Sequence, residues 1–193
     1  MMAGHPNETS PLGLRNIGFT IHMGDNDSLY NRNEVATDWK KKLKILREND
    51  LNGYSHFVKI HKNKGHWMEG LDTSAVSWIS NFSRNPYPEK IIWKQDDVTH
   101  KRFYWLNVIN PLLNAIIIAK IKDQIITIEK STIPNMIIML NDDLVDMNKK
   151  IIVKYLDKEI FKGIVQSIIY KKIDFLFAPF NRINMEQCFY IFN

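Results

Sequence analysis

The spacing of the apolar residues changes near the middle of the chain, and this change predicts two kinds of structure. Over residues 17–24 apolar residues alternate with small or polar ones, which is the period of a strand ending at Gly24. The next apolar residues recur every three to four positions, which predicts an amphipathic helix capped by Asn33. A second strand follows over residues 54–60. The helical stripe comprises Val35, Trp39, Leu43 and Leu46.

A second, shorter helix is expected after residue 70, with Asp72 as its cap. Its apolar residues are Leu71, Ala75, Trp78, Ile79 and Phe82. The order strand, helix, strand, helix is an α/β unit whose strands should be parallel, because a helix separates them. Two strands do not make a stable parallel sheet with both faces covered, so this half is predicted to be an incomplete sheet.

The prolines of residues 85–88 end the second helix and mark a domain boundary. Beyond them the apolar period becomes two, and short strands separated by turn residues predict an antiparallel β-sandwich-like module. The expected strands are 90–94, 103–108, 115–121, 125–129, 136–140, 151–155 and 159–168. The predicted fold class is therefore α/β followed by all-β, with domains 1–84 and 85–193. Residues 174–193 are aromatic-rich and irregular, and no element is predicted there.

Candidate chemistry lies in the loops that follow the two strands of the first half. Asp27 is the third residue after Gly24, and His66 follows the second strand in the sequence Gly65-His66-Trp67. Parallel strands joined by a helix bring both loops to the same edge of the sheet. The order acid, then histidine, is that of the last two members of a hydrolase triad, in which the acid orients the histidine and the histidine moves a proton. Asp25 is expected to hold the turn.

The residues around these two loops resemble the final part of an α/β hydrolase, of the prolyl-oligopeptidase or dienelactone-hydrolase-like type. The resemblance covers residues 1 to about 170 and includes a β-rich extension after the histidine. It rests on Gly24–Asp27, Tyr30–Asn33, Gly65–Met68, Trp93–His100 and Phe103–Leu106. It implies that Asp27 is the catalytic acid, that His66 is the catalytic base, and that the parent reaction is hydrolysis of a small ester or a peptide. Tyr30, Asn31 and Arg32 would shape the loop beside the acid.

The chain departs from that family in one essential part. The family's nucleophile lies in a Gly-x-Ser-x-Gly turn, and the sequence contains no such turn. We therefore expect the C-terminal fragment of a serine hydrolase, with Met1 internal to the ancestral chain, that is inactive alone. Its partner would be the missing N-terminal hydrolase segment. Two alternatives remain: one half of a two-chain hydrolase completed by a companion chain, and a non-catalytic β-rich binding or oligomerisation module.

Other functional classes find little support in the composition. The net charge of +5 is mild, and the basic run Lys40–Lys44 is expected to be the solvated face of a helix, so no nucleic-acid partner is predicted. A single cysteine and the histidine spacing predict no metal site, and no cofactor is expected. Trp93, Trp105 and their aromatic neighbours could stack on sugars or bases, or fill the core.

The sequence does not determine the compartment. No apolar run reaches the length needed to span a membrane, and Met1–Ser10 lacks the pattern of a signal peptide. A longer parent protein could be secreted or periplasmic.

Overall fold

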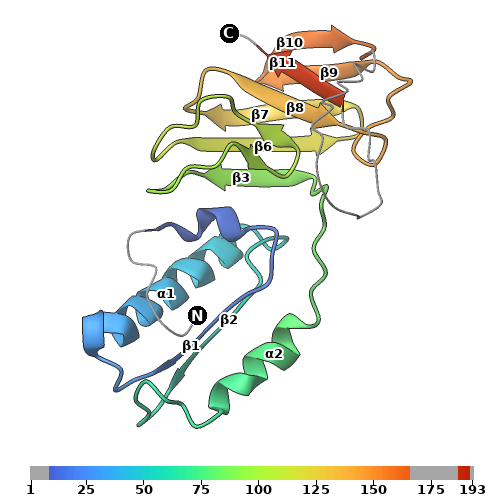
Figure 1. Cartoon of the computed structure of the whole chain (residues 1–193). Coiled ribbons are helices and arrows are strands. Elements are labelled where there is room, and N and C mark those ends of the chain that lie inside the picture. The colour runs from blue at the N-terminus through green and yellow to red at the C-terminus, as the bar shows by residue number, and fades with distance from the viewer. Residues whose placement is uncertain (1–8, 166–186, 192–193) are drawn as a thin grey trace, which may run out of the picture. The chain divides into compact units, whose positions relative to one another are not determined.

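The computed structural model describes residues 9–165 and 187–191 of the chain, and its fold is mixed α/β with a strong β content (Figure 1). The chain divides into two compact units. The first unit comprises Met1–Asn85 with Ile92–Asp97, and the second comprises Pro86–Ile91 with Val98–Asn193.

The first unit is built on two parallel strands, β1 (Phe19–Gly24) and β2 (His56–His61). Phe19 pairs with His56 and Gly24 with His61, so the two strands end together. The connecting helix α1 (Arg32–Asn49) allows the chain to return in the same direction, as predicted for a strand–helix–strand unit. The loops after β1 and β2 therefore emerge at one edge of the sheet.

Helix α1 covers one face of the strand pair with the predicted apolar stripe (Figure 1). Trp39 is 4% exposed and Leu43 is fully buried, and the Trp39 ring lies 5.7 Å from the ring of Phe19. Burying a side chain of this size stabilises a fold by about 1.5–3 kcal/mol. The core of this face comprises Ile21, Met23, Ala36, Trp39, Leu43 and Val58.

The opposite face of the strands meets a shorter segment, the 3-10 turn Leu71–Thr73 followed by α2 (Ser74–Ile79). Trp78 approaches Phe57 of β2, with ring centroids 5.8 Å apart. No residue of α2 is buried, and Val76 is 69% exposed. This face is thus much less completely covered than the face under α1.

Both predicted helix caps are wrong. Asn31, in a left-handed conformation, precedes α1, whereas Asn33 lies inside the first turn. The Asn33 amide instead donates to the Asp25 carbonyl oxygen at 2.7 Å, which ties the helix to the loop after β1. Asp72 lies within the 3-10 turn, and Thr73 precedes α2 without a side-chain cap. The Asn33 amide is thus used in a tertiary contact, and Asp72 belongs to the turn that precedes α2.

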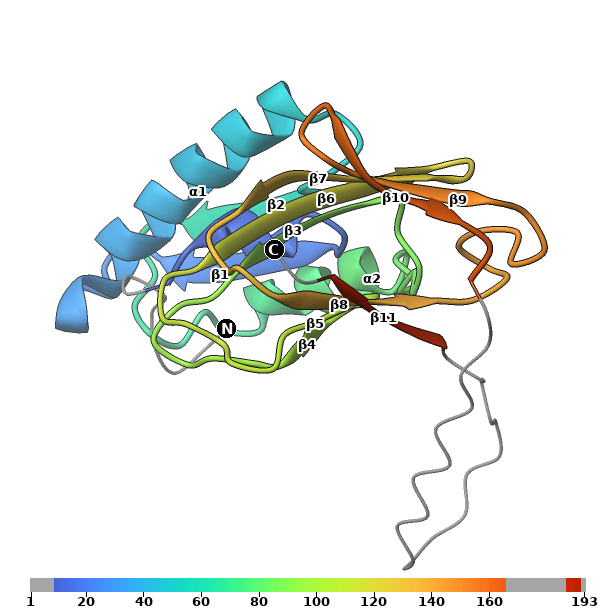
Figure 2. The same ribbon diagram turned by 90° about the horizontal axis from the view of Figure 1, so that it is seen from above.

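Two sheets build the second unit, apart from residues 92–94 of one edge strand, which are grouped with the first unit. Figure 2 shows the two sheets as two layers. The five-stranded sheet has the order β10-β9-β7-β6-β3, and the four-stranded sheet has the order β11-β8-β5-β4. The strands of the first sheet are β3 (Lys90–Lys94), β6 (Ile116–Lys122), β7 (Ile125–Ser131), β9 (Ile151–Tyr155) and β10 (Lys158–Gly163). Those of the second are β4 (Arg102–Phe103), β5 (Leu106–Asn107), β8 (Met136–Leu140) and β11 (Gln187–Ile191).

Three details differ from the predicted antiparallel strands. The expected strand 103–108 is a short hairpin of β4 and β5, since the chain reverses at Tyr104, whose φ is 52°. Strands β7 and β9 are parallel, because the chain leaves the first sheet after β7, forms β8 in the other sheet and then returns. Strand β10 ends at Gly163, and residues 166–168 of the expected last strand lie outside the described residues.

The two tryptophans singled out in the sequence, Trp93 and Trp105, are buried. Trp105 is 1% exposed and donates from its indole nitrogen to the Pro88 carbonyl oxygen at 2.8 Å, and Trp93 is 3% exposed. Neither indole face is therefore available to stack on a sugar or a base. Of the region for which no element was predicted, the described part is β11, and the remainder lies outside the described residues.

Candidate functional site

Two loops meet at the carboxyl ends of β1 and β2 and hold each other through their backbones. The Asp25 amide donates to the His61 carbonyl oxygen at 3.0 Å, and the Asn26 amide donates to the Lys64 carbonyl oxygen at 2.9 Å. Gly24 lies between them, and a Cβ at this position would overlap the carbonyl oxygens of Lys64 and Gly65. Gly24 is therefore required because the second loop passes directly over it.

Gly65, directly before His66, has no positive φ, and a Cβ there would meet no atom within 4 Å. Close approach of the loops depends on Gly24.

The structure brings the two predicted site residues together. The Nδ1 atom of His66 lies 2.9 Å from Oδ2 of Asp27, within hydrogen-bond distance. The Asp27 side chain is only 4% exposed, whereas the His66 side chain is 43% exposed. A buried carboxylate thus holds one nitrogen of an imidazole that solvent, or a bound molecule, can reach.

This hydrogen bond determines which nitrogen of neutral His66 carries the proton. A carboxylate can only accept, so Nδ1 must be the donor, and Nε2 is left with its lone pair. The Nε2 atom makes no hydrogen bond with residues 9–165. An imidazole in this state can accept a proton at Nε2 while the carboxylate stabilises the resulting cation.

Asp25, the other carboxylate of the loop, does not reach His66. Its carbonyl oxygen accepts from Asn33, and its Oδ1 atom is buried without a hydrogen-bond partner among the described residues. The choice of Asp27 over Asp25 as the partner of His66 therefore agrees with the geometry.

Arg32, at the start of α1, completes the group. Its Nη1 atom lies 3.4 Å from Asp27 Oδ1 and 3.4 Å from His66 Nδ1, and its side chain is 12% exposed. Because a guanidinium only donates, its approach to a protonated Nδ1 is not a hydrogen bond, and its partner is the Asp27 carboxylate. The resemblance implied only that Arg32 shapes the loop beside the acid, since nothing in the sequence pattern shows its distance from the carboxylate.

Two exposed aromatic residues lie beside this group. The Tyr30 ring lies 5.3 Å from the Arg32 guanidinium carbon, and the Trp67 ring lies 6.2 Å from the His66 ring. Tyr30 is 69% exposed and Trp67 is 85% exposed, so Trp67 does not shield the imidazole from solvent. Tyr30 and Asn31 both have φ near 55°, an uncommon conformation for residues other than glycine.

The group has no nucleophile among the described residues. No serine hydroxyl within residues 9–165 forms a hydrogen bond with His66. The described structure therefore contains the acid and the base of a possible triad without the group they would activate.

A second histidine pair was not predicted. His22 of β1 and His61 of β2 are each 4% exposed, and His22 Nδ1 lies 3.0 Å from His61 Nε2. Burial lowers the pKa of both imidazoles, and the neighbouring His61 lowers the pKa of His22 further. In the alternation over residues 17–24 His22 occupies a polar position, so the pattern carries no signal that it is buried.

The part of the chain that the structure describes contains no cluster of three or more metal-ligating side chains. Within that same part, no helix combines the length and the apolar character needed to cross a bilayer.

Comparison of the chain with protein-family models, with curated proteins and with solved structures gives no match. Any functional assignment therefore has to be argued from the site itself.

Proposed function

We propose that Asp27 and His66 are the acid and base of a serine-hydrolase triad whose nucleophile is supplied by another polypeptide segment. The observation that carries the proposal is the 2.9 Å contact between His66 Nδ1 and a nearly buried Asp27 carboxylate. Such a contact orients an imidazole so that Nε2 can take the proton of a serine hydroxyl. The reaction would be hydrolysis of an ester or an amide.

In this proposal, the first unit corresponds to the last two strands and helices of an α/β-hydrolase domain. Support comes from the parallel pair β1–β2 and from the position of both loops at its carboxyl edge. The second face of this pair, which α2 covers only in part, also agrees with an incomplete sheet. The second unit would be the β-sandwich-like extension expected from the resemblance. The missing N-terminal hydrolase segment or a companion chain would add the serine and the backbone donors that stabilise the oxyanion.

The decisive experiment is complementation. Alone, the chain should not hydrolyse p-nitrophenyl butyrate above the background given by free imidazole. Mixed with the polypeptide encoded immediately upstream, it should gain activity and allow a fluorophosphonate probe to label a serine of that polypeptide. His66→Ala should abolish both the gain and the labelling. Hydrolysis that survives both His66→Ala and Asp27→Ala would refute the proposal.

A second candidate is a non-catalytic β-rich binding or oligomerisation module that retains the pair as a remnant. It is favoured by the lack of any described hydroxyl bonded to His66. In that case no polypeptide partner would confer esterase activity, and His66→Ala would leave every binding property unchanged.

A further inference from the structure

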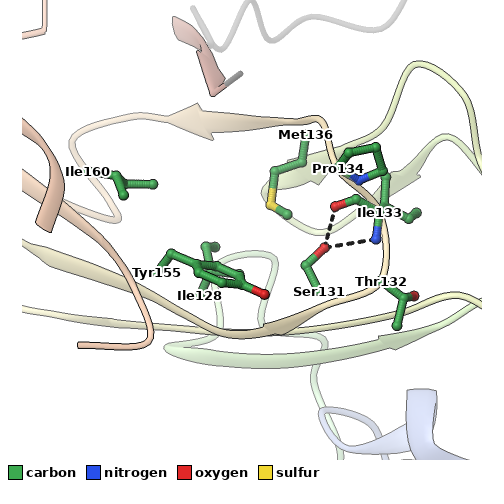
Figure 3. A pocket seen from close by; sticks show the side chains of 8 residues that line it. All are labelled: Ile128, Ser131, Thr132, Ile133, Pro134, Met136, Tyr155 and Ile160. Atoms are coloured by element: carbon green, nitrogen blue, oxygen red, sulfur yellow. Dashed lines mark hydrogen bonds between the residues drawn. The ribbon is translucent and has the colours of Figure 1, made fainter. Parts of the chain in front are cut away.

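We propose that the second unit binds a small, neutral, largely apolar molecule in a pocket between its two sheets, anchored by the Tyr155 hydroxyl. This inference concerns a different unit from the Asp27–His66 pair and does not depend on the proposed hydrolase function. Figure 3 shows the pocket and the side chains that line it.

The pocket forms where the chain crosses from one sheet to the other. Strand β7 ends at Ser131, and β8 begins in the second sheet at Met136. Ser131 Oγ donates to the Ile133 carbonyl oxygen at 2.6 Å and accepts from the Ile133 amide at 3.1 Å, and Pro134 restricts the backbone that follows. These interactions hold the backbone between β7 and β8 in one conformation, and this segment forms one side of the pocket.

A β-bulge supplies the opposite side. Glu159 pairs with Lys154 and Phe161 with Val153, so Ile160 is an extra, unpaired residue of β10. Bulges commonly redirect a side chain, and the Ile160 side chain is among those that line the pocket (Figure 3).

The size and lining of the pocket select the chemistry of its occupant. Its volume is about 240 Å³, larger than the roughly 150 Å³ cavity that accommodates benzene. None of its lining residues is charged, and most of the lining side chains are apolar. A charged ligand would lose its hydration without gaining a counter-charge, so the expected occupant is neutral, with a ring or branched aliphatic group.

One polar group in the pocket remains available to a ligand. The hydroxyls of Ser131 and Thr132 already bond to the backbone, at Ile133 and Ile116 respectively. The Tyr155 hydroxyl makes no hydrogen bond with the described residues, and it lies toward the Ser131 corner in Figure 3. It can donate to a carbonyl or ether oxygen, which gives the ligand one required acceptor.

The test uses the full chain and three probes of similar size. Methyl benzoate carries a neutral acceptor, ethylbenzene lacks an acceptor, and benzoate carries a charge. Binding is measured by NMR titration, following the methyl signals of Ile128 and Met136. We expect saturable binding of methyl benzoate, weaker binding of ethylbenzene, and none of benzoate.

Two variants separate the anchor from the cavity. Tyr155→Phe should lower the affinity for methyl benzoate by about fivefold, the effect of losing one hydrogen bond. The affinity for ethylbenzene should not change. Ile160→Trp should fill the pocket and abolish binding of both. Tyr104→Phe removes a phenol hydroxyl elsewhere in the same unit and should change neither affinity. Circular dichroism verifies that each variant is folded.

The proposal is overturned if the folded chain shows no saturable binding of methyl benzoate. It is equally overturned if Tyr155→Phe and Tyr104→Phe have the same effect, or if folded Ile160→Trp retains the wild-type affinities.

Discussion

Gly24 and Lys64 lie so close together that any side chain on Gly24 would overlap the Lys64 carbonyl oxygen. This contact joins the loop that carries Asp27 to the loop that carries His66. We expect Gly24→Ala to lower the free energy of unfolding by about 1–3 kcal/mol, since backbone would have to move to accommodate the methyl group. Urea denaturation measures the change.

The matched control is Gly65→Ala, because a Cβ at Gly65 meets no atom within 4 Å. This variant should change the free energy of unfolding by less than about 0.5 kcal/mol. Equal stabilities of the two alanine variants would show that the close contact at Gly24 does not hold the loops together.

The Asp27–His66 hydrogen bond can be tested without any activity assay. With the carboxylate present, neutral His66 should carry its proton on Nδ1, because the carboxylate can only accept. In Asp27→Asn the amide can donate as well as accept, so the Nδ1-protonated tautomer of His66 should no longer be favoured. The ¹⁵N chemical shifts of the imidazole report the tautomer. Identical shifts in the two proteins would contradict the assigned hydrogen bond.

Arg32 should contribute to stability through the buried carboxylate of Asp27. In Arg32→Ala this carboxylate retains its hydrogen bond with His66 but loses its ion pair with the guanidinium. We expect a loss of about 1–3 kcal/mol in the free energy of unfolding. On the same helix, Lys42 pairs with Asp38 at 2.6 Å, and the two side chains are 47% and 54% exposed. Lys42→Ala should therefore cost only about 0.3–0.5 kcal/mol. A similar loss in both variants would contradict a specific role for Arg32.

The buried pair His22 and His61 predicts loss of stability in acid. Burial lowers the pKa of both imidazoles below their ordinary value of 6.5, so the unfolded chain binds more protons than the folded chain in mildly acidic solution. The part of the free energy of unfolding that depends on neutral imidazoles is fully present above pH 6.5. It decreases as the pH falls through 6.5 toward the folded-state pKa values. His22→Gln removes one titrating group and should reduce this dependence.

Urea unfolding between about pH 7.5 and pH 5.5 checks the prediction, because the window spans the unfolded-state pKa of histidine. If wild-type protein and His22→Gln lose the same stability over this window, the buried pair does not contribute to the pH dependence.

Much of the local structure was predictable from residue spacing. The alternation before Gly24, the three-to-four-residue stripe over Trp39 and Leu43, and the period of two after Pro88 all depend on neighbours along the chain. The proximity of the Asp27 and His66 loops was also predictable, because parallel strands joined by a helix end at the same edge. The assignment to the α/β hydrolases stays a prediction.

What the sequence determined by itself was therefore the type of most elements and the proximity of two loops. Only the tertiary structure decided that Arg32 reaches Asp27, that His22 faces His61, and that Ile160 turns into a pocket. These features depend on strand register, on a bulge and on distances between residues far apart in the chain. A local pattern encodes which face a side chain occupies, but it does not encode which side chain lies opposite.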